Sequence, residues 1–138
     1  MLTKQLTIFM EDREGRLCEV LEILKENDIN VLSASIADNG SDFGLFRMTV
    51  SDTEKAYEAL KAKGMMVKIT EIIAVTVPHR TGSLETILKA ISEADINIQY
   101  MYGMASEDHQ AAIAIKTDNQ EKALEVLKKV EHVTANTN

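Results

Sequence analysis

The stretch DREGRL at residues 12–17 returns as HRTGSL at residues 79–84, 67 positions further along the chain. Each stretch follows a run of apolar and β-branched residues and precedes a segment whose leucines and isoleucines recur at helical spacing. When the chain is aligned with itself at this offset, no gap is needed and identities continue through both copies: Arg13/Arg80, Gly15/Gly82, Leu17/Leu84, Leu21/Leu88, Glu26/Glu93, Asp28/Asp95, Ile29/Ile96, Asn30/Asn97, Lys55/Lys122, Glu58/Glu125 and Leu60/Leu127. The chain is therefore a tandem duplication, and we expect one domain over 1–67 and a second over 68–138, where the repeat reaches about residue 134 and a short polar tail follows.

Within each copy, the hydrophobic periodicity changes in the same order. Strands are expected at 5–10, 29–37, 43–50 and 65–69, and in the second copy at 71–77, 96–104 and 111–117. One helix follows the first strand of each copy, and a second helix is expected to open at Ser51 with Glu54, or at Asp118 with Glu121, as in a capping box. This βαββαβ order predicts an α+β fold of two ferredoxin-like domains, in which two helices cover one face of a four-stranded antiparallel sheet.

Residues 65–77 contain no glycine, proline, asparagine or aspartate that would break a strand. The last strand of the first copy is therefore expected to run into the first strand of the second copy with only a bend. Because no flexible linker fits there, we predict that the two antiparallel sheets lie side by side with all helices on one face.

Composition restricts the classes of function. A net charge of -7 repels phosphate backbones, and only 4% of the residues are aromatic, so nucleic-acid binding is disfavoured. No apolar run approaches the roughly 18 residues of a membrane span, so no membrane association is expected. The single cysteine, Cys18, excludes a disulfide framework and a cysteine-based zinc site, and His109 and His132 have no metal-ligand spacing. We expect a cytoplasmic protein with no cofactor, no metal and no catalytic residues.

The repeated loop carries the main candidates for binding. Gly15 and Gly82 stand where a strand gives way to a helix, and the first helical N–H groups have no internal partner and carry the positive end of the helix dipole. A carboxylate could dock there, although glycines that only permit a tight turn are the alternative. Asn30 and Asn97 begin the second strand, where an amide can bind both ends of an amino acid or only assist the turn.

These features resemble the ACT domains, a family of small regulatory modules that bind amino acids. The resemblance rests on DREGRL with NDINV and on HRTGSL with ADINI, once per copy and over nearly the whole chain. The sequence departs from the family pattern at Glu14 and Thr81, which replace the usual proline. The resemblance implies an amino-acid ligand held by the loop of one domain and the asparagine of its neighbour, and a protein partner such as a metabolic enzyme or regulator.

We therefore expect a non-enzymatic, amino-acid-binding regulatory protein that acts in trans. An interaction module without a ligand and, less favoured, a small enzyme remain alternatives, and homodimer formation is left open. The better site is expected to pair the loop 79–84 with Asn30 and to prefer a small or medium amino acid, because that loop is less crowded and less acidic than 12–17. The candidate ligand-binding residues are His79, Arg80, Thr81, Gly82, Ser83, Leu84, Asn30, Asp12, Arg13, Gly15, Leu17 and Asn97.

Overall fold

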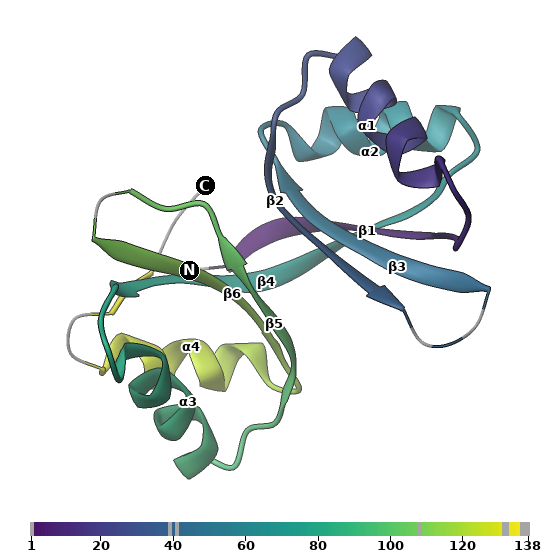
Figure 1. Cartoon of the computed structure of the whole chain (residues 1–138). Helices are drawn as coiled ribbons and strands as arrows, with labels where there is room; N and C mark the ends of the chain where they lie inside the picture. The colour runs from purple at the N-terminus through teal and green to yellow at the C-terminus, as the bar shows by residue number, and fades with distance from the viewer. Residues whose placement is uncertain (1, 39, 41, 108, 131–132, 136–138) are drawn as a thin grey trace. The chain divides into compact units, whose positions relative to one another are not determined.

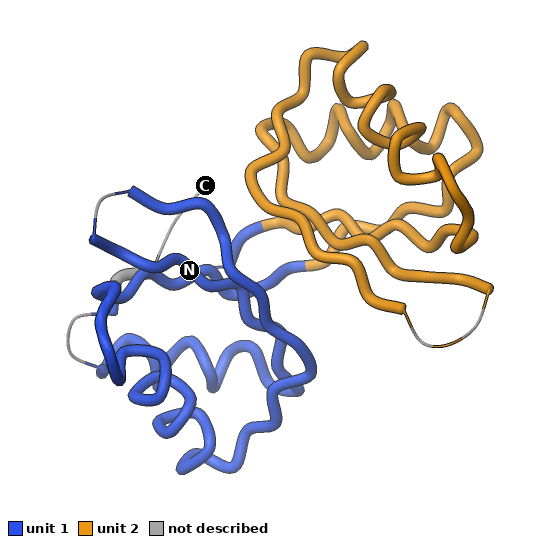
Figure 2. Tube along the Cα trace, viewed as in Figure 1, with its two compact units in different colours: residues 1–3, 71–138 blue, residues 4–70 orange. Residues whose placement is uncertain are grey.

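The computed structural model describes residues 2–38, 40, 42–107, 109–130 and 133–135. The chain forms two compact units (Figure 2): unit 2 comprises residues 4–70, and unit 1 comprises residues 1–3 with 71–138. Unit 2 thus holds most of the first sequence repeat, and unit 1 holds the second.

Unit 2 contains the predicted βαββαβ order. Its elements are β1 (Leu2–Glu11), α1 (Arg16–Glu26), β2 (Val31–Asp38), β3 (Phe43–Val50), α2 (Thr53–Ala62) and the first part of β4 (Met66–Pro78). The strand order is β2-β3-β1-β4, and β3 pairs antiparallel with both β1 and β2. Both helices cover one face of this sheet (Figure 1). Between them lies a core that includes Leu6, Ile8, Leu24, Met48 and Leu60.

Unit 1 repeats this plan. The rest of β4 is followed by α3 (Ser83–Glu93), β5 (Ile98–Met104), β6 (Gln110–Thr117), α4 (Gln120–Lys128) and the short β7 (Thr134–Ala135). The strands run in the order β4-β6-β5, and β7 pairs antiparallel with β4. Helices α3 and α4 lie on one face of the sheet (Figure 1), and their core includes Ile73, Ile87, Ile91, Ile115 and Leu127. The ferredoxin-like fold expected from the sequence is confirmed in both units.

Strand β4 connects the two sequence repeats across residues 65–77. It runs without interruption for 13 residues from Met66 to Pro78, as the absence of strand-breaking residues predicts. The arrangement of the two sheets side by side stays a prediction. The polar tail at 136–138 lies outside the described residues.

The second helix of each unit starts one residue later than expected. Asp52 and Asn119 are the N-cap residues, and each side chain accepts a hydrogen bond from a backbone N–H three residues on. The capping boxes predicted at Ser51 and Asp118 are therefore wrong. Those two side chains instead accept hydrogen bonds from the backbone N–H groups of the residues that precede β2 and β5, which ties the two segments together.

The first helix of each unit ends through an aspartate with positive φ. Asp28 has φ 55° and Asp95 has φ 58°, and the next residue, Ile29 or Ile96, donates a backbone hydrogen bond back to the last helical turn. A left-handed residue at this position closes the helix by satisfying its terminal carbonyl groups. Aspartate tolerates that conformation better than most residues other than glycine.

We predict that Asp28→Val lowers the free energy of unfolding by about 1–2 kcal/mol, because a β-branched side chain is strained at positive φ. Asp28→Gly, which relieves the strain, should leave stability unchanged or raise it. Urea denaturation followed by circular dichroism measures both variants. Equal losses in the two variants would mean that the carboxylate itself, rather than the backbone conformation, matters here.

Candidate functional site

The loop between the first strand and the first helix has the same backbone in both units. Gly15 (φ 80°) and Gly82 (φ 90°) are left-handed N-cap residues, and neither supplies a side-chain cap to the helix that follows. An added Cβ would meet nothing within 4 Å at either glycine, so conformation and not crowding selects glycine here. The helix N-termini therefore keep N–H groups that no side chain of the loop caps.

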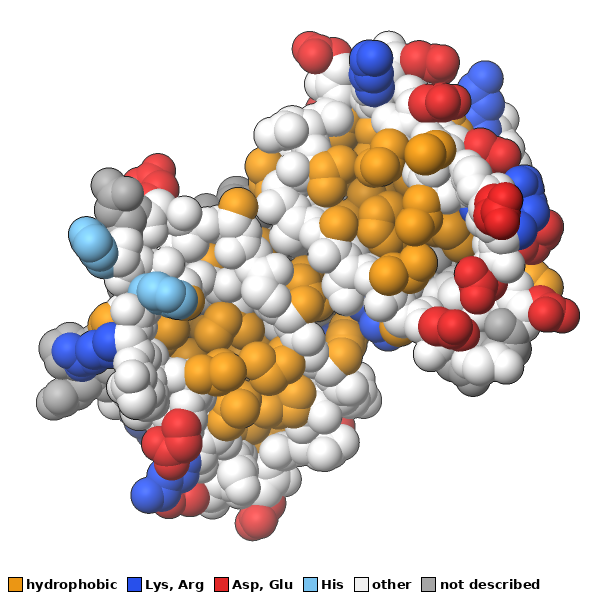
Figure 3. Space-filling view, in the orientation of Figure 1, with side chains coloured by type: hydrophobic (Ala, Val, Ile, Leu, Met, Phe, Trp, Pro, Cys, Tyr) orange, Lys and Arg blue, Asp and Glu red, His pale blue; other side chains and the backbone are white. Residues whose placement is uncertain are grey.

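A pocket opens beside this loop in unit 1. Its volume is about 540 Å³, which lies within the range of small-molecule sites. Loop and helix residues form one side, and the ends of β4, β5 and β6 form the other. The lining residues are Val77, Pro78, His79, Arg80, Ser83, Leu84, Met101, Gly103, Met104, Ser106, Gln110, Ala111, Ala112 and Ile113. Figure 3 shows apolar side chains gathered between α3 and β5 on this face of the unit. The pocket thus combines an apolar interior with a polar loop at its edge.

Arg80 lies at this pocket with its charge unneutralised. No carboxylate lies within ion-pair distance of Arg80 among the described residues, and the pocket lining contains no acidic side chain. His79 is the other ionisable residue in the lining, and both side chains are exposed. An anion entering this pocket would therefore meet positive charge and no carboxylate in the pocket lining.

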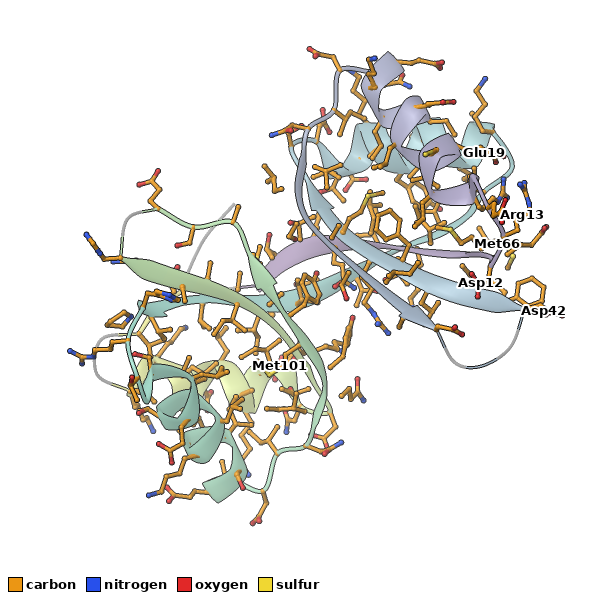
Figure 4. The ribbon with its side chains drawn as sticks, viewed as in Figure 1. Asp12, Arg13, Glu19, Asp42, Met66 and Met101 are labelled. Atoms are coloured by element: carbon orange, nitrogen blue, oxygen red, sulfur yellow. The ribbon has the colours of Figure 1, made fainter. Side chains whose placement is uncertain are left out.

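The corresponding loop of unit 2 is neutralised by its own side chains. Arg13 pairs with Glu11 and with Glu19, each at 3.3 Å, and Arg16 Nη1 donates to Glu19 Oε2 at 2.5 Å. Figure 4 shows Arg13 and Glu19 side by side at the start of α1. Arg16 is largely covered, and its Nε is buried. Two arginines in this loop are thus already occupied by carboxylates of the same unit.

Three substitutions between the repeats explain the difference. Glu11, Arg16 and Glu19 correspond to Pro78, Ser83 and Thr86 in the second copy. Arg80 therefore retains the position of Arg13 but has neither of its carboxylate partners. The short Ser83 side chain also occupies far less space than the arginine that it replaces.

The structure brings together only part of the predicted site. His79, Arg80, Ser83 and Leu84 line the pocket of about 540 Å³, and Thr81 and Gly82 line an adjoining pocket of about 320 Å³ that also contains Glu85. The backbone N–H of Ser83, expected to bind a carboxylate, already donates to the carbonyl of Arg80 at 3.3 Å. The side chains of His79, Arg80 and Ser83 therefore remain as the polar groups of the loop at the pocket of about 540 Å³.

The remaining predicted residues lie elsewhere. Asp12, Arg13, Gly15 and Leu17 belong to the loop and helix of unit 2, where Asp12 donates a backbone hydrogen bond to Asp42 at 2.7 Å. The exposed residues Asn30 and Asn97 each precede the second strand of their unit. Neither asparagine is among the residues that line the pocket of unit 1. The predicted pairing of the loop 79–84 with Asn30 stays a prediction.

Sequence reasoning missed the strand residues of the pocket. Met101, Gly103 and Met104 of β5, and Gln110 to Ile113 of β6, form its floor, and none was a candidate. One available signal was the replacement of Ile36 in the first copy by Gly103 in the second, because a large apolar residue and a glycine at one repeat position seldom serve the same packing role.

Metal and membrane features are not evident in the described part of the chain. It contains no group of three or more His, Cys, Asp or Glu side chains placed to hold a metal ion. His132 lies outside the described residues. No described helix combines the length and the apolar character needed to span a membrane. Cys18 is free and exposed on α1.

The sequence matches a known protein family over nearly its whole length. The chain has two ferredoxin-like units with the same loop between strand and helix, and the model of the ACT domain pair matches residues 1–137. The chain belongs to the ACT domain pair family.

Solved structures share the fold of this chain. Protein BT0572 from Bacteroides thetaiotaomicron is 39% identical, with a TM-score of 0.89 over 98% of this chain and 93% of that one. The ligand-free regulatory subunit of aspartate kinase from Thermus thermophilus shares the fold at 18% identity, with a TM-score of 0.65 and 95% of both chains covered. The corresponding subunit from Thermus flavus, also 18% identical, has a TM-score of 0.64 over 91% of this chain and 92% of that one. Among curated proteins, none matches the sequence.

The ion pairs of unit 2 give a titration test. The hydrogen bond from Arg16, and to a smaller extent the charge of Arg13, lower the pKa of Glu19 below the ordinary glutamate value. Because the pKa is lower in the folded chain than in the unfolded chain, this pairing favours folding above the ordinary glutamate pKa and is lost as the pH falls through the lowered value. We predict that Arg16→Ser, which installs the residue of the second copy, raises the pKa of Glu19 toward its ordinary value. Carboxyl-detected NMR titration measures the shift, and an unchanged pKa would remove Arg16 as its main cause.

Proposed function

We propose that this ACT domain pair is a non-enzymatic regulatory protein that binds an amino acid in the pocket of unit 1. The observation that supports this most directly is the free positive charge of Arg80 at the edge of an apolar pocket. The equivalent Arg13 is neutralised by carboxylates, so the difference does not follow from the fold that the two units share.

Arg80 is suited to bind the α-carboxylate of the ligand. A guanidinium group presents several N–H donors in a fixed plane, and a charge-assisted hydrogen bond to a carboxylate is stronger than a neutral one. His79 and Ser83 lie in the same lining and add donors. The N-terminus of α3, which has no side-chain cap, adds the positive end of the helix dipole.

The α-ammonium group of the ligand requires acceptors. Gln110 and Ser106, which line the pocket, each carry a side-chain oxygen that can accept from an ammonium. Because no carboxylate lines the pocket, the ammonium is held by neutral acceptors, and the carboxylate provides the larger share of the electrostatic attraction.

The proposed regulatory output is the control of a partner protein, such as a metabolic enzyme or another regulator. A ligand in the pocket would contact three elements of unit 1, namely the end of β4, strand β5 and the start of α3. An occupied pocket would therefore stabilise one arrangement of these elements. A ligand changes the affinity for a partner only when it favours one conformation of the protein over another. Reciprocity then requires the partner to alter the affinity for the amino acid by the same factor.

Alanine at Arg80 tests the proposal. We predict that thermal melts with each of the twenty amino acids identify a ligand, which at about 100 times its dissociation constant adds about 2.7 kcal/mol to the free energy of unfolding. Arg80→Ala should weaken its binding by roughly ten- to hundredfold in calorimetry, because a charge-assisted hydrogen bond of about 1.5–3 kcal/mol is lost. The matched control is Arg13→Ala, which removes the equivalent arginine of the other repeat and should leave the affinity unchanged.

Other results would separate the alternatives. If no amino acid shifts the melt, the chain acts as an interaction module without such a ligand. An equal loss in Arg13→Ala and Arg80→Ala would show that the pocket of unit 1 is not the site. The corresponding acid without its amino group adds a further measurement, since binding as tight as that of the amino acid would leave the ammonium without a role.

A further inference from the structure

Gly103 is a glycine that the fold does not require. It lies inside strand β5, its φ is not positive, and an added Cβ would meet nothing within 4 Å. A glycine inside a strand costs conformational entropy and contributes no packing. At this position neither backbone conformation nor crowding compensates for that cost.

The space beside Gly103 is part of the pocket. Gly103 pairs across the ladder with Ile113 and Met101 pairs with Ile115, so Gly103 and Met101 are on the sheet face that α3 covers. Leu84 of α3, which is 42% exposed, lines the same pocket. Figure 4 shows Met101 among the side chains of this layer. The missing side chain at Gly103 thus leaves room bounded by leucine, isoleucine and methionine.

The first repeat has a large apolar side chain at this position. Ile36 corresponds to Gly103 and pairs with Phe46, which corresponds to Ile113. The pair Ile36 and Phe46 therefore places two large side chains where unit 1 has a glycine and an isoleucine. Ile36 is 56% exposed, and with Arg16 in place of Ser83 it adds side-chain atoms that the second copy lacks at these positions.

The charges of the lining restrict what can occupy the space. His79 and Arg80 are its ionisable residues, and both belong to the loop. A second charged group on the ligand, placed beside Gly103, would lose contact with water and find no opposite charge there, which is unfavourable. An apolar group would instead bury its surface against Leu84, Met101 and Ile113. Methionine is well suited to such contacts because its flexible side chain adapts to several shapes.

We propose that Gly103 determines the specificity of the site, and that the ligand is an amino acid with an apolar side chain that occupies the space beside Gly103. This inference rests on the proposed amino-acid binding of unit 1 and specifies the class of ligand. The side chain of the ligand takes the place that Ile36 fills in the other repeat, while its carboxylate lies toward Arg80.

Calorimetry with leucine, methionine and phenylalanine, and with glycine, aspartate and lysine, tests the preference. At least one of the first three should bind about tenfold or more tightly than each of the last three. Gly103→Ile should weaken that binding by about tenfold or more, because the added side chain competes for the same volume, and Gly103→Ala should weaken it less. Ile36→Gly, the reciprocal change in unit 2, should leave the affinity unchanged, and circular dichroism checks that each variant is folded.

NMR of methyl-labelled methionine supplies a direct readout. The bound amino acid should shift the Met101 methyl resonance, whereas Met66, which is 67% exposed at the opposite end of β4 from Pro78, should not respond. Preferential binding of aspartate or lysine, or unchanged affinity in a folded Gly103→Ile variant, would overturn the apolar specificity while amino-acid binding itself stands. If none of the six binds and no other amino acid shifts the melt, the proposed function fails as well.

Discussion

Both units depend on a constraint at one point of the chain: a strand must end and a helix must begin within a few residues. A glycine with positive φ makes this turn in each copy, at Gly15 and Gly82, and fixes where the first helical residues lie relative to the end of the strand. The arginine two positions earlier and the residue directly after the glycine are thereby held at the same edge of each unit. What these two positions can do then depends on the side chains around them.

The two loops have similar backbones but different neighbouring side chains. In unit 2, Arg13 and Arg16 are held by Glu11 and Glu19. Exposed ion pairs of this kind contribute little to stability, so their clearest consequence is that the loop has no free cation to offer. In unit 1 the carboxylates are absent, and Arg80 stands at a pocket whose interior is apolar. The loop arginines of one copy are therefore paired with carboxylates, whereas Arg80 of the other copy has no such partner among the described residues.

The fold could be predicted from sequence because the signals that determine it are local and occur twice. Hydrophobic periodicity, the two loop glycines and the unbroken run of β4 all correspond to observed features. The helix starts at Asp52 and Asn119 were missed by one residue, because neighbouring polar residues compete for the cap and tertiary hydrogen bonds take Ser51 and Asp118 away from it. The loop residues of the candidate site could also be predicted from the sequence. The residues of the candidate site on β5 and β6 could not be predicted, because it is the pairing between strands that brings them near the loop.

Gly103 lowers the stability of strand β5, and this cost points to a role in binding. A side chain at that position would strengthen β5, would meet no obstruction and would fill open space, and the first repeat has such a side chain in Ile36. Stability alone therefore favours the larger residue. At the position of Ser83 the first copy has Arg16, which is largely covered and pairs with Glu19. Both smaller residues open the same pocket, next to the one loop arginine that lacks a carboxylate partner among the described residues. Gly103, Ser83 and Arg80 lie at one pocket, and the proposed binding of an apolar, carboxylate-bearing molecule accounts for all three.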